Sequence, residues 1–148
     1  MSTLATLPTS PATTKPPPRF LDLDERVPAA LRKALEEADG CLQMGFTTGG
    51  AACARVAVRT IVHMEHADAS DYATSLLALS DKHPAVPPAL FQIVGMLGGG
   101  DEPLSSEALR ALIAAVKAIV YEIYVLGAER VERLMYVHEL VETLKREK

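Results

Sequence analysis

The chain has 148 residues, 49% of them apolar and 23% charged, a composition typical of one soluble domain with a substantial core. Its formal net charge is −4, and residues 20–126 carry the excess of acid. An acidic globular part argues against nucleic acid or an anionic membrane as a partner, and we expect neither.

Residues 1–22 are rich in Pro, Thr and Ser and contain no continuous apolar run. Such a segment buries too little apolar surface to offset the entropy of ordering it, so we expect a flexible arm. Its PPPRF stretch could bind a protein partner as a polyproline II ligand, although a plain tether is the simpler interpretation. The arm does not resemble a secretory signal, and the sequence therefore predicts a cytoplasmic protein.

The next part of the chain, to residue 66, has the pattern of two helices joined by a glycine turn. The first is expected to begin near Asp24, to carry an apolar stripe at helical spacing and to end at Gly45. The second is expected to start after Thr47 or Thr48, either of which can cap it, and to run to about His66.

Two shorter helices are predicted to follow. The third starts after Ala69 or Ser70 and stops before Pro84, because the residue before a proline disfavours helical dihedral angles. The fourth opens at residues 87–88, which are both proline, and ends in the glycine run at residues 98–100.

A fifth helix is predicted from a cap at Ser105 or Ser106 to about Leu126, and it is apolar on nearly every side. Lys117 and Glu122 interrupt the apolar run, which argues against a membrane span. In so small a protein we expect its second face to meet another chain, which gives a homodimer. The predicted dimer interface consists of Leu112, Ile113, Val116, Ile119, Val120, Ile123 and Tyr124.

The last segment, residues 127–148, is predicted to be an amphipathic helix after a bend or break at Gly127. Its apolar residues recur at helical spacing, and we expect it to pack on the bundle or on a partner chain. No segment shows the two-residue alternation of a strand. The apolar stripe of this last helix is predicted to consist of Val131, Leu134, His138 and Val141. The sequence thus predicts an all-α fold of five to six helices, in which residues 23–126 form a compact bundle.

The second helix raises the question of chemistry, because it starts from GFTTGG and carries a stripe of Arg55, Arg59, His63 and His66. A phosphate-binding loop needs a Lys where Ala51 stands, so the glycines are better explained as a turn. An Arg/His face can cleave RNA without a metal, since His moves a proton and Arg stabilises phosphorane charge. A solvated stripe paired with nearby acids explains the same residues and is the interpretation we favour.

Metal and disulfide chemistry have little support in the sequence. Cys41 and Cys53 are expected to be free, buried thiols, because two cysteines with this spacing do not make a disulfide framework. His63 and His66 lie three residues apart and could face one ion, but no further ligand pattern accompanies them. We therefore expect no metal and no cofactor.

The order of the segments resembles a bacterial domain family of unknown function in the HEPN superfamily (higher eukaryotes and prokaryotes nucleotide-binding). The resemblance covers residues 28–126. It is based on ALRKALEEADGCLQMGFTTGGAACARVAVRTIVHM, then LFQIVGMLGGGDEP, then SSEALRALIAAVKAIVYEIYVL. It implies a helical bundle that pairs as a dimer and serves as an accessory module in restriction, abortive-infection or toxin–antitoxin proteins.

Active relatives in that superfamily place a catalytic Arg and His in an Arg-x-x-Gly-Asn-x-x-x-His segment before the long helix. This sequence departs from the segment, because Gly95, Gly99 and Pro103 stand near the positions of the Arg, Asn and His. The resemblance therefore transfers no catalytic residue. It favours a non-catalytic dimerisation or interaction domain, with a role in bacterial defence or phage-related regulation. The alternatives are a metal-independent ribonuclease using the Arg/His stripe and a sensor of a small ligand or nucleotide.

Overall fold

The structure is a computed structural model that describes residues 24–100 and 102–147, so the expected arm at residues 1–22 lies outside the described part. Every regular element in these residues is helical, which confirms the all-α prediction. The helices are α2 (Ala29–Gln43), α3 (Thr47–Met64), α4 (Tyr72–Lys82), α5 (Pro88–Gly98), α6 (Ser106–Val120) and α7 (Gly127–Arg146), with a π-helical segment, η3 (Tyr121–Leu126), between the last two.

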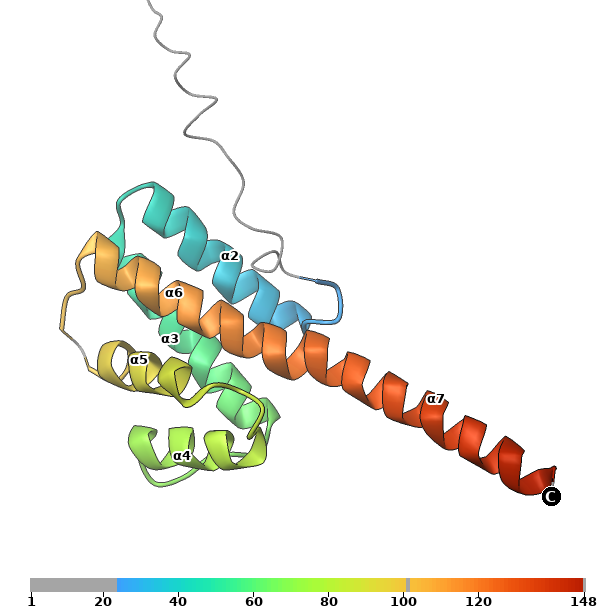
Figure 1. Cartoon of the computed structure of the whole chain (residues 1–148). Helices are drawn as coiled ribbons and strands as arrows, with labels where there is room; N and C mark the ends of the chain where they lie inside the picture. The colour runs from blue at the N-terminus through green and yellow to red at the C-terminus, as the bar shows by residue number, and fades with distance from the viewer. Residues whose placement is uncertain (1–23, 101, 148) are drawn as a thin grey trace, which may run out of the picture.

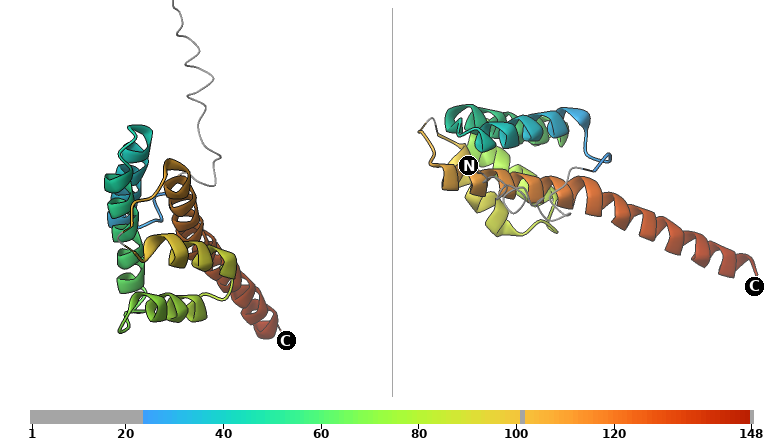
Figure 2. Two further views of the ribbon diagram at one scale, coloured as in Figure 1. Left: turned by 90° about the vertical axis from the view of Figure 1, so that its left-hand side faces the viewer. Right: turned by 90° about the horizontal axis from the view of Figure 1, so that it is seen from above.

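The bundle is built around α6, which runs beside α2, α3 and α5, while α4 lies against α5 at the lower edge (Figure 1). Figure 2 shows from two further sides that α2 and α3 form one antiparallel pair. The core consists mostly of aliphatic side chains from the five helices α2 to α6, which gather where α6 meets its neighbours. The largest fully buried side chains include Leu31, Leu35, Ile61, Leu79, Leu109 and Leu112.

Helix starts follow the local chemistry in some places and not in others. The Ser105 hydroxyl accepts a hydrogen bond from the backbone N–H of Ala108 and so caps α6, as predicted, while Asp71 caps α4 by accepting from Thr74. The prediction for α3 is wrong, because the helix begins at Thr47 without a side-chain cap. α2 likewise begins at Ala29, after a turn at residues 24–27, and not near Asp24.

The expected break at Gly127 is also wrong. Gly127 has helical dihedral angles, and the chain continues from α6 through η3 into α7 as one rod of 41 residues (Figure 1). The local irregularity is the π-helical segment at residues 121–126, where backbone hydrogen bonds span five residues in place of four. A glycine in a helix interior costs only about 1 kcal/mol relative to alanine, which is too little to interrupt a helix that neighbouring residues favour.

The predicted dimer interface on the fifth helix needs a correction. Five of its seven residues lie in the core of the single chain, where α2, α3 and α5 cover them, and none is more than 3% exposed. Only two, Ile123 and Tyr124 in η3, remain partly exposed. The apolar circumference of α6 is therefore accounted for within one subunit; the five covered residues are Leu112, Ile113, Val116, Ile119 and Val120.

The continuous rod from Ser106 to Arg146 is long enough to cross a membrane, and one window of 18 residues has a mean hydropathy of 1.8. Lys117 and Glu122 were expected to argue against a membrane span, yet by length and composition alone the rod qualifies as a candidate for one. The larger apolar residues of α6 are packed against α2, α3 and α5, while 39% of that window as a whole is buried.

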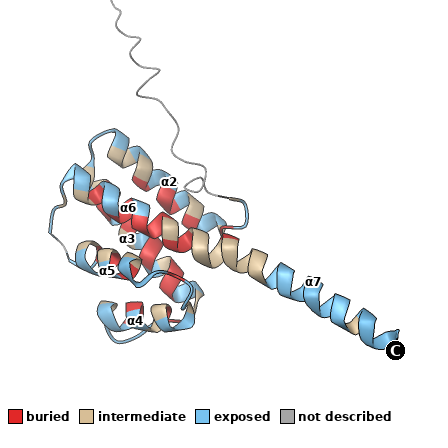
Figure 3. Ribbon diagram, in the orientation of Figure 1, coloured by how far each residue is buried: buried red, intermediate tan, exposed pale blue. Residues whose placement is uncertain are grey.

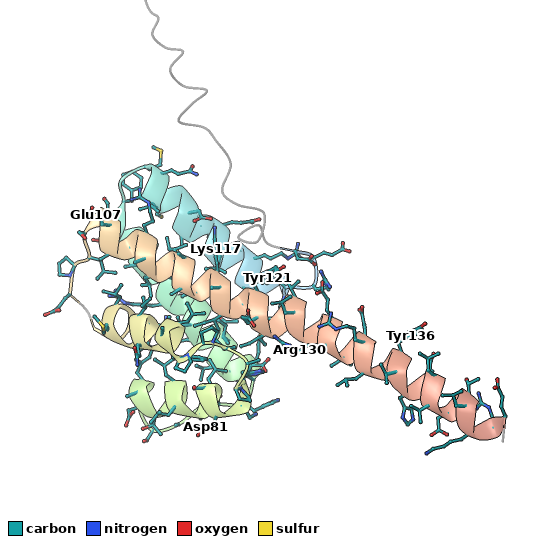
Figure 4. All side chains as sticks on the ribbon, viewed as in Figure 1. Asp81, Glu107, Lys117, Tyr121, Arg130 and Tyr136 are labelled. Atoms are coloured by element: carbon teal, nitrogen blue, oxygen red, sulfur yellow. The ribbon has the colours of Figure 1, made fainter. Side chains whose placement is uncertain are left out.

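Lys117 is the charged residue most deeply buried within α6, and its ammonium donates a hydrogen bond to the Asp39 carboxylate on α2. In Figure 4 its side chain points from α6 toward α2. The pair ties the two helices together beside the core, and each charge offsets the desolvation of the other.

We predict that Asp39→Ala costs about 2 kcal/mol of unfolding free energy, because it leaves the Lys117 ammonium desolvated without its partner. Lys117→Met in the same background should recover most of that loss, since it removes the orphaned charge and keeps the volume. Urea unfolding of both variants checks this. Equal stability of the single and double variants would contradict the pairing.

Candidate functional site: the α7 arm and the groove at its base

α7 extends beyond the bundle as a free arm (Figure 1). No residue of α7 is buried, and every residue from Val131 to Val141 is exposed. Figure 3 shows the change along the rod, from red in α6 through tan at its middle to pale blue over most of the arm. The structure therefore excludes one of the two expected positions of this helix, packing on its own bundle.

The arm carries an unusual amount of exposed apolar surface for a helix in water. Val131, Leu134, His138 and Val141 form the predicted stripe, which spans about 80° at 100° per residue. We call these four residues the arm face. Val131 and Leu134 are 55% and 69% exposed, and further apolar side chains border the face on one side: Val137, Leu140 and Leu144.

The opposite side of the arm is polar. Glu129, Glu132 and Thr143 lie there by helical spacing, and Tyr136, which projects from the rod in Figure 4, lies directly opposite the arm face. Arg130 and Arg133 interrupt the apolar side by the same spacing, and the exposed Met135 lies beyond the other edge of the arm face, so the separation of apolar from charged residues is partial.

At the base of the arm a groove of about 520 Å³ lies between the rod and the segment that joins α4 to α5. The rod contributes Ile123, Tyr124, Gly127 and Val131, and the joining segment contributes residues 82–86. Its wall is mostly apolar. Because Val131 lines both this groove and a second hollow with Leu134 and His138, the arm face and the base groove form one continuous surface.

A polar cluster holds the joining segment against the rod. The Glu65 carboxylate contacts Nε2 of His83 at 2.8 Å through one oxygen and accepts a hydrogen bond from the Tyr124 hydroxyl at 2.9 Å through the other. Burial, and then the hydrogen bond to Glu65, raise the pKa of Tyr124 above its ordinary value. The cluster joins the end of α3, the end of α4 and η3, so its main effect is to fix the shape of the base groove.

Tyr124→Phe removes one hydrogen bond from this cluster, and we predict a loss of about 1 kcal/mol of unfolding free energy at neutral pH. Tyr136→Phe is the matched control, because Tyr136 is 63% exposed on the arm, and it should change stability by less than about 0.5 kcal/mol. Because the folded state keeps Tyr124 protonated, its contribution is complete below the pKa of unfolded tyrosine and falls as the pH rises above it. Urea unfolding at neutral and alkaline pH measures both effects.

The structure does not assemble the Arg/His stripe into a reaction centre. Arg55 points toward α5, where its guanidinium donates to the Leu97 carbonyl at 3.5 Å. His63 is 83% exposed and lies 3.5 Å from Asp68, the type of acidic partner that the solvated interpretation expects. His66 is outside α3 with a φ of 57°, and Arg59 is the one residue of the stripe that lines the hollow containing Asp68.

Arg59 lines a hollow of about 280 Å³ with Asp68, Asp71 and Tyr72, and this is the place most relevant to the sensor alternative. Its volume falls just below the usual range for small-ligand pockets. Burial raises the pKa of Tyr72 to about 12, although Arg55 and Arg59 act to lower it.

The segment that departs from the HEPN motif is used for close packing. A methyl group on Gly98 would lie 2.5 Å from the Tyr72 hydroxyl oxygen and one on Gly99 2.9 Å from the same ring. The Tyr72 hydroxyl in turn donates to the Val94 carbonyl at 2.9 Å. These glycines therefore let α4 approach α5.

Cys41 and Cys53 are free thiols, as predicted, but they are half-buried and not fully buried. Within the described residues no three His, Cys, Asp or Glu side chains are placed to hold a metal ion. No family model, curated protein or solved structure matches this chain.

Sequence reasoning missed the Glu65–His83–Tyr124 cluster and the base groove. His83 and Tyr124 lie 18 and 59 positions after Glu65 and follow no local pattern, so only the packing of α3, α4 and the rod brings the three residues together. The arm face itself could be read from the spacing of its residues.

Proposed function

We propose that this protein is a non-catalytic helical assembly domain that forms a homodimer through the arm face of α7. The observation that carries the proposal is the arm itself, a helix of 20 residues with no buried residue, whose arm face exposes three aliphatic side chains. A relation to the HEPN superfamily is part of the proposal only through the sequence resemblance, as is a role in bacterial defence or phage-related regulation.

Energetics favour a covered arm. Helices in proteins gain most of their stability from packing an apolar face and less from the propensities of their residues. Fully burying a Val or Leu side chain contributes roughly 1.5–3 kcal/mol, and the arm exposes six of them: Val131, Leu134, Val137, Leu140, Val141 and Leu144. Pairing two arms would cover much of this surface on both copies.

A second copy is a better match for the arm than an anionic partner. The arm has equal numbers of acids and bases between residues 127 and 148, and the rest of the globular part is acidic. Long-range attraction to nucleic acid or an anionic membrane is therefore weak. The ribonuclease and sensor alternatives lack an observation of comparable weight, since the Arg/His stripe forms no shared site.

Amide hydrogen exchange at two protein concentrations tests the proposal. If arms pair between copies, amides of residues 131–144 should exchange at least about tenfold more slowly at 100 µM than at 1 µM, because association protects the helix. Amides of α2 and α6 serve as the internal control and should not respond to concentration, since their protection comes from one chain. Arm amides whose exchange is the same at both concentrations would overturn the proposal.

A further inference from the structure

We infer that the two arms pair antiparallel, so that the tip of each arm lies over the base groove of the other copy. This inference rests on the proposed self-association and adds its geometry. It follows from three features of the described residues: the position of the base groove, the order of side chains along the arm face and the placement of Lys145.

The base groove blocks one direction of pairing. The segment at residues 82–86 lies over the rod beside Ile123, Tyr124 and Val131, on the side from which the arm face continues outward. In a parallel pair, both copies would bring this segment to the same end and the two bundles would collide along the seam. In an antiparallel pair, that end receives only the slender tip of the other arm.

The order of side chains along the arm suits the antiparallel direction. Placing Val131 opposite Val141 of the second copy sets Leu134 opposite the second copy's His138. The two Val137 side chains then lie beside each other near the centre of the seam. Val137 borders the arm face on one side, and the same borders of two packed helices meet only when the helices run in opposite directions. All the layers formed by the arm face thus contain at least one aliphatic side chain.

The ends of the seam also match. In this register Lys145 lies opposite Gly127, which has no side chain to obstruct the long lysine, in a groove that is also lined by the Glu122 carboxylate and by the cations Lys82 and Arg130. A parallel pair would instead stack Lys145 on Lys145, and like charges opposed at a seam are destabilising. The antiparallel direction places the two ammonium groups at opposite ends of the seam.

Single-cysteine variants distinguish the two directions. In a background of Cys41→Ala and Cys53→Ala, Val137→Cys should cross-link the dimer under mild oxidation by O₂, whereas Lys145→Cys should not. Each cross-link joins two thiols, which lose two electrons and two protons to the oxidant. The tips of the two arms are about 27 Å apart in the antiparallel register, at about 1.5 Å per residue over roughly 18 residues, beyond the reach of a disulfide.

The outcomes separate this inference from the proposed function. Cross-linking of Val137→Cys alone supports antiparallel pairing. Cross-linking of Lys145→Cys alone, or no cross-link in a sample whose light scattering gives a dimer, overturns the antiparallel register and leaves self-association standing. A mass of one chain for the reduced background protein at 100 µM overturns both, provided that its circular dichroism spectrum matches that of the wild-type chain.

A charge-rescue experiment needs no cysteine substitution. Val131→Glu alone and Val141→Arg alone should each weaken the dimer at least about tenfold. The double variant should recover dimerisation only in the antiparallel register, where the carboxylate introduced at position 131 meets the guanidinium introduced at position 141 of the other copy, once at each end of the seam. Failure of the double variant to recover, with both single variants still weakened, would overturn the inferred direction.

Discussion

Leu134→Lys is expected to raise the dissociation constant of the dimer at least about 100-fold, which corresponds to roughly 3 kcal/mol at about 1.4 kcal/mol per factor of ten. Leu134 is 69% exposed in the single chain and lies at the middle of the arm face. The substitution removes an aliphatic contact from both copies and places a cation where the proposed seam holds His138 or a second Leu134. Light scattering over a concentration series measures the effect.

Tyr136→Lys is the matched control for this variant. Tyr136 lies on the same helix and is 63% exposed, but it points to the side opposite the arm face. It should leave the dissociation constant within about a factor of three. Equal weakening by the two variants would mean that the arm face is not the surface that pairs, and no effect of either would mean the same.

The second large effect is expected inside the bundle. Leu112→Ala should lower the unfolding free energy by about 2–5 kcal/mol, the usual cost of truncating a fully buried leucine. Leu112 is 0% exposed in the single chain, where α6 meets α2, α3 and α5. Because the covering residues belong to the same chain, the loss should be the same at every protein concentration. Urea unfolding at two concentrations measures it.

Leu77→Ala provides the control for size and residue type, because Leu77 is on α4 and 65% exposed. It should change the unfolding free energy by less than about 0.5 kcal/mol. If Leu112→Ala changed the dissociation constant and left the unfolding of the monomer unaffected, Leu112 would belong to a dimer interface and the assignment of α6 to the core would be wrong.

The helices could be predicted from the sequence largely because nearby residues determine where they begin and end. Pro88 at the start of α5 and the Ser105 cap of α6 act through their own backbone and side-chain geometry, so the sequence alone is enough to place them. Phe46, which precedes α3 without capping it, offers no such signal. Thr47 and Thr48, which follow it, are both residues that commonly cap helices, so the sequence favoured a start after one of them.

The error about α6 has a physical cause. An apolar helix signals burial on several sides, but the sequence does not say whether the covering surfaces come from the same chain. Here α2, α3 and α5 supply all of them for residues such as Val116 and Val120. The apolar surface that stays uncovered lies further along the rod on α7, whose stripe was predicted from its spacing while its position relative to the bundle was left open.

The base groove could not have been predicted by the same reasoning. Its shape depends on the continuous helical passage of the rod through Gly127 and on the hydrogen bonds of Glu65 with His83 and Tyr124. The hydrogen bonds arise from packing between segments that are distant in the sequence, and a glycine inside a helical pattern weakens the signal for a continuous helix.

Sedimentation equilibrium of the full chain between 1 and 100 µM tests the central claim, that the arm needs a second copy. A chain of 15.9 kDa should approach twice that mass at the upper concentration and move toward a single chain on dilution. A mass of one chain throughout, with the arm still helical by circular dichroism, would show that α7 is stable uncovered and would contradict the account.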